Sequence, residues 1–117
     1  MTAYRFAIGT ACALVMAGCS TTSRREAPIG AELVGQQVRM ETSRGQVSTL
    51  TFREDLTVRA QFGQNSVTGR WQVSDDGLCF WWASAPRECW PYPTRLRPGE
   101  TRSLTSDRGN RVTITML

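Results

Sequence analysis

The residues of this chain that could do covalent chemistry are its four cysteines. A thiolate is a nucleophile, a metal ligand and a disulfide partner. The sequence has no histidine, which is both the commonest general base and the commonest metal ligand. It also has no lysine. Its carboxylates are scattered, and the adjacent pair Asp75-Asp76 suits a turn that lacks the further oxygen ligands of a calcium loop. We therefore expect no enzyme activity, no cofactor and no metal site.

Cys79 and Cys89 are separated by nine residues and fall on neighbouring predicted strands. This spacing suits a disulfide across a hairpin, whereas redox proteins use Cys-x-x-Cys. Such a bond persists in the oxidising compartments that exported proteins reach. We therefore expect Cys79 and Cys89 to be bonded to each other, and the closed loop to add about 2–3 kcal/mol to stability.

Cys19 follows an apolar segment near the start of the chain. Residues 6–17 carry no charge and follow Arg5, but twelve residues are fewer than the roughly 20 that a membrane-spanning helix needs. Met16-Ala17-Gly18-Cys19 resembles the lipobox of bacterial lipoproteins. The resemblance implies a diacylglyceryl group on the Cys19 thiol, cleavage between Gly18 and Cys19, and acylation of the new amino group by a fatty acid such as palmitate.

These features divide the chain into a signal peptide (1–18), a lipidated N-terminus with a flexible tether (19–27) and one domain (28–117). Ser20 follows the cysteine, and by resemblance to lipoproteins this favours the outer membrane. We expect the domain to face the periplasm, close to the membrane, because eight extended tether residues reach at most about 26–29 Å. The arginines are spread without a run, so we expect no nucleic-acid partner.

The pattern that must position these residues is an alternation of apolar and polar side chains in short segments. Residues 28–35 could hold one helical turn. Asp75-Asp76-Gly77 predicts a tight hairpin turn. The fold expected is all-β: a small antiparallel meander of about eight short strands, closed or half-open as a barrel, with at most one short helical turn. The predicted strands are 36–42, 46–52, 56–62, 66–74, 78–83, 88–92, 101–105 and 111–117.

Most of the aromatic residues lie between Trp71 and Tyr92. Alternation places Phe80 and Trp82 on one face of their strand and Trp81 on the other. The simplest interpretation is that all of the aromatic side chains pack in the core. The functional one is a platform that stacks on a sugar or on a partner protein, with one tryptophan largely exposed, for which we expect Trp81. The candidate binding residues are Trp81, Trp90, Tyr92, Arg87 and Arg95.

The segment GRWQVSDDGLCFWW, followed by CW, resembles a small family of exported bacterial domains of unknown function. Their pattern is G-x-W, a hairpin turn, a strand with a cysteine and a second cysteine on the next strand. TFREDLTV resembles the turn that precedes this pattern, with Leu56 in place of a glycine. The resemblance implies a β-rich exported domain and no activity. SVTGRW and FWWAS are also similar to membrane-bound lysozyme inhibitors, although Lys-Gly does not follow the tryptophans here.

The function expected from these patterns is that of a lipoprotein anchored to the outer membrane through Cys19. Its domain would be a binding or envelope-maintenance module with a possible envelope protein or glycan as partner. The alternative is an inhibitor of lysozyme or of another envelope hydrolase.

Overall fold

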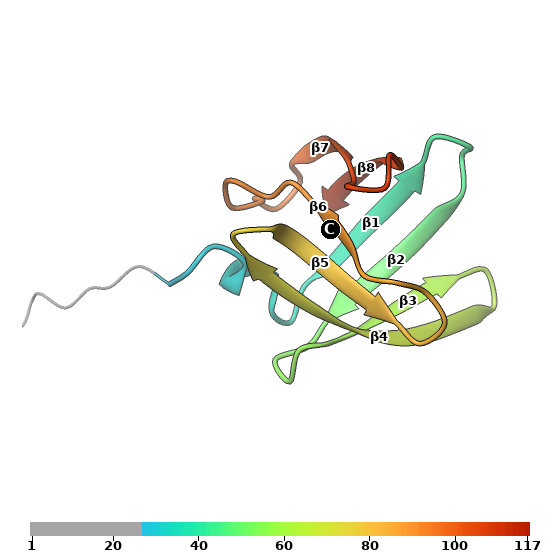
Figure 1. Ribbon diagram of the computed structural model, residues 1–117, viewed down its shortest axis with the longest axis horizontal. Coiled ribbons are helices and arrows are strands. Elements are labelled where there is room, and N and C mark those ends of the chain that lie inside the picture. Colours follow the sequence, from blue (N-terminus) through green and yellow to red (C-terminus); the bar gives the residue numbers. More distant parts are fainter. Residues whose placement is uncertain (1–26) are drawn as a thin grey trace, which may run out of the picture.

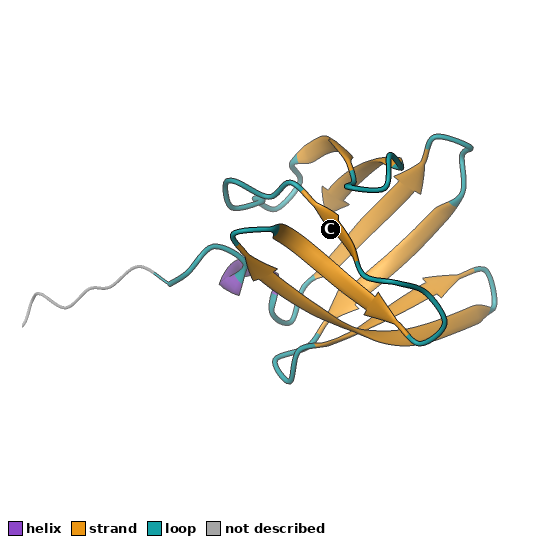
Figure 2. Cartoon of the chain, in the orientation of Figure 1, coloured by secondary structure: helices purple, strands orange, loops and turns teal. Residues whose placement is uncertain are grey.

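The computed structural model describes residues 27–117, so the predicted signal peptide, the Gly18–Cys19 cleavage site and most of the tether lie outside the described residues. Within this range the structure contains no helix long and apolar enough to span a membrane. It forms short strands and a single 3-10 turn (Figure 2). The elements are η2 (Ala31–Leu33), β1 (Gln37–Thr42), β2 (Val47–Phe52), β3 (Thr57–Phe62), β4 (Asn65–Ser74), β5 (Gly77–Trp82), β6 (Glu88–Trp90), β7 (Thr101–Thr105) and β8 (Arg111–Met116).

The eight strands form one antiparallel sheet in the order β6-β5-β4-β3-β2-β1-β8-β7. Consecutive strands pair from β1 to β6, and the β7–β8 hairpin returns to the free side of β1. The sheet curls into a nearly closed barrel, in which β6 and β7 approach each other (Figure 1). The predicted all-β meander is confirmed. β6 is shorter than predicted, since it ends at Trp90, directly before Pro91, and a proline cannot donate to a ladder.

The seam between β6 and β7 is closed by single contacts, since the two strands are not paired with each other in the described sheet. At one end, the Asp107 amide donates to the Cys89 carbonyl oxygen at 2.9 Å. The Cys89 amide in turn donates to Asp107 Oδ1 at 3.1 Å. At the other end, the Arg102 guanidinium donates to the carbonyl oxygens of Thr94 at 2.8 Å and Arg95 at 3.0 Å. One backbone bond and several side-chain bonds therefore take the place of the ladder that would close the barrel.

The core fills the barrel interior because alternate residues of each strand point inward. Phe52 and Trp71 meet edge to face with ring centroids 5.0 Å apart, and the Trp71 indole N–H donates to the Arg53 carbonyl oxygen at 3.2 Å. The strand residues of the hydrophobic core cluster are Val38, Leu50, Phe52, Val58, Ala60, Trp71, Leu78, Phe80, Trp90, Leu104, Val112, Ile114 and Met116.

One end of the barrel, here called the closed end, is filled by η2 and by the segment 91–100. Leu33, Tyr92 and Leu96 are all buried in the core cluster. The Tyr92 hydroxyl donates to the Glu32 carboxylate and accepts the Leu96 amide at 3.0 Å. Burial and the Glu32 carboxylate raise the pKa of Tyr92. These contacts tie the segment before β1 to the segment before β7.

The turn between β2 and β3 contains Leu56 in the left-handed region, with φ at 68°. Glycine adopts positive φ at no steric cost, whereas the Cβ atom of a leucine is crowded there. The turn is kept by hydrogen bonds on both sides of the residue. The Leu56 amide donates to the Arg53 carbonyl oxygen at 3.1 Å, and its own carbonyl accepts the Trp71 amide at 3.0 Å. Leu56 is thus held in a strained backbone conformation by its neighbours.

Candidate functional site

A cavity of about 500 Å³ opens at the end of the barrel opposite the closed end. We call it the mouth. It is lined by the β1–β2 turn, the β7–β8 turn and residues of β5 and β6; both turns lie at this end of the barrel (Figure 1). Its floor is apolar, and its rim is polar. The floor residues are Met40, Phe80, Trp82, Trp90 and Val112. Ligand sites in small β-barrels are found in such mouths.

Trp82 is a half-buried residue of this floor. Its ring stacks on Phe80, with centroids 5.6 Å apart and an interplanar angle of 10°. Gly69 lies opposite Trp82 on β4, and a Cβ at Gly69 would be 2.5 Å from Trp82 Cε3. The absence of a side chain at Gly69 therefore makes the space that the indole occupies. Stacking and this close approach hold Trp82 in one position.

Glu88 brings a carboxylate to the mouth, because it lies opposite Phe80 in the β5–β6 pairing and shares its face. Its Oε2 accepts the Ser106 hydroxyl at 2.5 Å and the Asn110 side-chain amide at 2.6 Å. The Ser106 hydroxyl oxygen also accepts the amides of Arg108 at 3.1 Å and Asn110 at 3.2 Å. This network fixes the β7–β8 turn against β6 and shapes that side of the rim.

Arg44 and Arg111 also line the rim. The Ser43 amide donates to the Arg111 carbonyl oxygen at 3.2 Å, so the turn that carries Arg44 is bound to the start of β8. Both arginines are exposed. Neither forms an ion pair with a carboxylate of residues 27–117. The rim thus presents two positive charges that the described part of the fold does not use.

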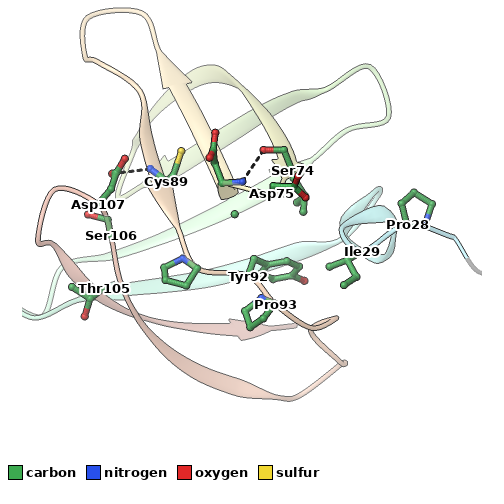
Figure 3. A pocket seen from close by; sticks show the side chains of 14 residues that line it. Pro28, Ile29, Ser74, Asp75, Cys89, Tyr92, Pro93, Thr105, Ser106 and Asp107 are labelled. Carbon is green, nitrogen blue, oxygen red and sulfur yellow. Dashed lines mark hydrogen bonds between the residues drawn. The ribbon is translucent and has the colours of Figure 1, made fainter.

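A second, broader hollow of about 790 Å³ follows the seam on the outside of the barrel (Figure 3). Pro28 and Ile29 lie on one side, and Cys89 and Asp107 on the other. Asp107 is bonded to the Cys89 amide, as the dashed line shows, and Asp76 forms an ion pair with Arg87 at 3.3 Å. The Asp107 carboxylate is used by the seam, and the Asp76 carboxylate is paired with Arg87. The mouth is therefore the better candidate for a ligand.

The predicted disulfide is confirmed. Cys79 and Cys89 lie directly opposite each other on β5 and β6, with Cα atoms 4.0 Å apart, and their sulfurs are bonded. β6 makes only three residue pairs with β5, so the bond is a large part of what holds this strand. Through β6 it also holds Glu88 and Trp90 at the mouth.

The five candidate binding residues do not form one platform. Trp81 lies on the outer face and is 38 % exposed, opposite Arg70. Trp90 and Tyr92 are each 5 % exposed. Trp90 faces inward opposite Leu78, and Tyr92 belongs to the closed end. Their assignment to an outer platform with Trp81 is corrected by this burial.

The two arginines of that predicted platform also lie apart. Arg87 is at the start of β6, where its guanidinium is paired with Asp76. Arg95 is at the closed end, where its Nε lies 3.9 Å from a Glu32 carboxylate oxygen and its guanidinium donates to the Ala27 carbonyl oxygen. Trp81 is near the opposite end of β5, so the fold does not join it to Arg95.

The mouth was missed in the sequence because its residues look like core or turn residues. Phe80 and Trp82 share one face, and alternation gives no depth along the barrel. One signal was present: Glu88 shares a face with Trp90, and a carboxylate on an otherwise apolar face indicates an opening to solvent.

Comparisons with known proteins add no relative to this description. No family model, no curated protein and no solved structure matches the chain. The functional assignment therefore rests on the residues of this chain alone.

Proposed function

We propose that this protein is a lipoprotein of the bacterial outer membrane whose barrel faces the periplasm and acts as a binding or envelope-maintenance module. The anchor rests on Met16-Ala17-Gly18-Cys19, which resembles a lipobox, and on Ser20 after it. Acyl chains on Cys19 would hold the protein firmly, because each buried methylene adds about 0.8 kcal/mol and a lipoprotein carries more than one chain.

The single observation that carries the binding function is the apolar floor of the mouth, a cavity of about 500 Å³ beside the half-buried ring of Trp82. Leu33, Tyr92 and Leu96 fill the barrel interior at the closed end. A hollow of about 1050 Å³ lies there as well, but the charged residues in its lining include the ion pairs Glu32–Arg95 and Glu100–Arg102. A cavity of this size with an apolar floor and a few polar groups is typical of a ligand site.

The direction of the mouth suits a tethered protein. Pro28 and Ile29, the start of the domain, lie on the side of η2 and the closed end. The tether would therefore join the barrel away from the mouth. A ligand could reach the mouth from the periplasm while the lipid remains in the membrane.

The anchor is tested by expressing the full chain in a bacterium fed with labelled palmitate. We expect the label to enter the wild type and to be lost in Cys19→Ala. Cys12→Ala is the matched control, because it removes a thiol from the apolar segment that cleavage would discard. Mass spectrometry should give Cys19 as the first residue, and the protein should sediment with the outer membrane. Loss of label in Cys12→Ala alone, or another first residue, would refute the anchor.

A further inference from the structure

The mouth combines an apolar floor with two arginines that form no ion pair with a carboxylate of residues 27–117, and we infer that its ligand is an anionic amphiphile. The apolar part of the ligand would pack on Trp82 and Phe80, and its carboxylate or phosphate head would lie between Arg44 and Arg111. This inference rests on the proposed binding function and names the chemical class of ligand.

The apolar half of the argument comes from Trp82. Phe80 stacks on one face of the Trp82 ring, and the absence of a side chain at Gly69 leaves space for the ring. The Trp82 side chain nevertheless remains half-buried. Covering the remaining apolar surface is favourable by roughly 25 cal/mol per Å². The ring is already fixed, so little side-chain entropy is lost when a hydrocarbon chain packs against it.

The charged half comes from Arg44 and Arg111. The hydrogen bond from Ser43 to the Arg111 carbonyl holds the two arginine-bearing segments side by side. A guanidinium presents a planar fork of donors that matches carboxylate and phosphate oxygens. Neither arginine has a carboxylate partner within residues 27–117, so an anionic head would not have to displace one.

Glu88 is the group in the mouth that opposes an anion. Its Oε2 already accepts hydrogen bonds from Ser106 and from Asn110, the residue before Arg111. A cationic head could instead stack on Trp82 beside Glu88. The two arginines outnumber this carboxylate at the mouth, so we infer the anion and make the cation an arm of the test.

The experiment uses the full mature lipoprotein in lipid nanodiscs, titrated calorimetrically with empty nanodiscs as the blank. The probes share a six-carbon chain and differ in the head: hexyl phosphate, hexanoate, hexyl glucoside and hexyltrimethylammonium. Inorganic phosphate alone reports the head without the chain. We expect the two anionic amphiphiles to bind about tenfold more tightly than the glucoside, because charge-assisted hydrogen bonds are the stronger ones. Whether hexyl phosphate or hexanoate binds more tightly decides between a phosphate and a carboxylate source.

The matched variants are Arg44→Gln/Arg111→Gln at the rim and Arg39→Gln/Arg53→Gln elsewhere on the exposed surface. Both remove two positive charges. The rim variant should weaken hexyl phosphate about tenfold and leave hexyl glucoside unchanged, while the control variant should change neither. Trp82→Ala should weaken every amphiphile.

Three results would overturn the inference. Equal binding of glucoside and phosphate would refute the anionic head and leave the mouth as a binding site. Tighter binding of the ammonium, or an equal effect of the two arginine variants, would refute the role of Arg44 and Arg111. Absence of binding by every probe would refute this inference and the proposed mouth site together, and the palmitate result would still decide the anchor.

Discussion

Asp107 and Cys89 close the barrel through a reciprocal pair of hydrogen bonds, one between backbones and one from backbone to side chain. The Asp107 amide donates to the Cys89 carbonyl oxygen at 2.9 Å, and the Cys89 amide donates to Asp107 Oδ1 at 3.1 Å. The same cysteine is bonded through sulfur to Cys79. Cys89 therefore joins the β5 side of the barrel to the β7–β8 turn at a single residue.

Asp107→Ala removes the acceptor for the Cys89 amide at the seam. We expect the free energy of unfolding to fall by about 1–2 kcal/mol, because a charge-assisted bond is lost and the amide is left without its partner. Urea unfolding of the variant and of the wild type measures this difference in the free energy of unfolding. Asp75→Ala, in the neighbouring β4–β5 turn, is the control and should change stability little. Equal losses in the two variants would show that the seam bond contributes nothing specific.

Reduction of the Cys79–Cys89 bond should lower the free energy of unfolding by about 2–3 kcal/mol. It should also weaken hexyl phosphate binding, because β6 carries Glu88 and Trp90 and has only three residue pairs with β5. Unfolding and calorimetry with and without a reductant measure the two effects. Labelling of both thiols in the unfolded, unreduced protein would contradict the bond.

Leu56→Gly should raise the free energy of unfolding by up to about 1 kcal/mol. The left-handed backbone costs a non-glycine residue about 1–2 kcal/mol, and the greater freedom of glycine in the unfolded chain offsets part of the relief. Leu56→Ala keeps the strained backbone and is the control. Thermal unfolding of the three proteins checks this, and a less stable glycine variant would mean that the Leu56 side chain matters more than its φ.

Tyr92 should make stability fall at alkaline pH. Burial and the hydrogen bond to Glu32 raise the pKa of its hydroxyl above the ordinary value near 10. The folded state therefore favours the neutral form. Its contribution is complete below pH about 10 and is lost as pH rises toward the folded pKa. In Tyr92→Phe this pH dependence should disappear.

Tyr92 is the only tyrosine after residue 18, so tyrosinate absorbance of the mature protein reports it directly. The folded protein should show no tyrosinate at pH values where the urea-unfolded protein is half ionised. Coincident titration curves for the folded and unfolded protein would contradict the raised pKa.

The strands and turns could be predicted because they depend on local pattern. Alternation places Phe80 inward and Trp81 outward, and Asp75-Asp76-Gly77 makes the predicted turn, with Gly77 at a φ of 106°. The depth of a side chain along the barrel is different, because it depends on where every other strand ends. Phe80 and Trp82 share a face and both line the mouth, yet Phe80 is buried and Trp82 is only half-buried.

The buried position of Tyr92 also could not be predicted from the sequence pattern. Its burial depends on Glu32, which lies sixty residues earlier in the chain. The Glu32 carboxylate accepts a hydrogen bond from the Tyr92 hydroxyl. Nothing in the alternation of residues 88–92 indicates that the following segment folds over the barrel end. The same tertiary contact draws Arg95 away from the aromatic strands, and so separates it from Trp81.

The pairing of β1 with β8 also has a consequence for the order of folding. Val38 on β1 lies opposite Met116 on β8. One edge of the first strand therefore stays unpaired until the last strand has been synthesised. Contacts of such long sequence separation form late, since the intervening chain must be ordered first. During synthesis the N-terminus leaves the ribosome first, so the meander from β1 to β6 can form while one edge of β1 is still unpaired. The arrival of the β7–β8 hairpin covers that side, brings Arg111 beside Arg44 and so completes the mouth as the final event of folding.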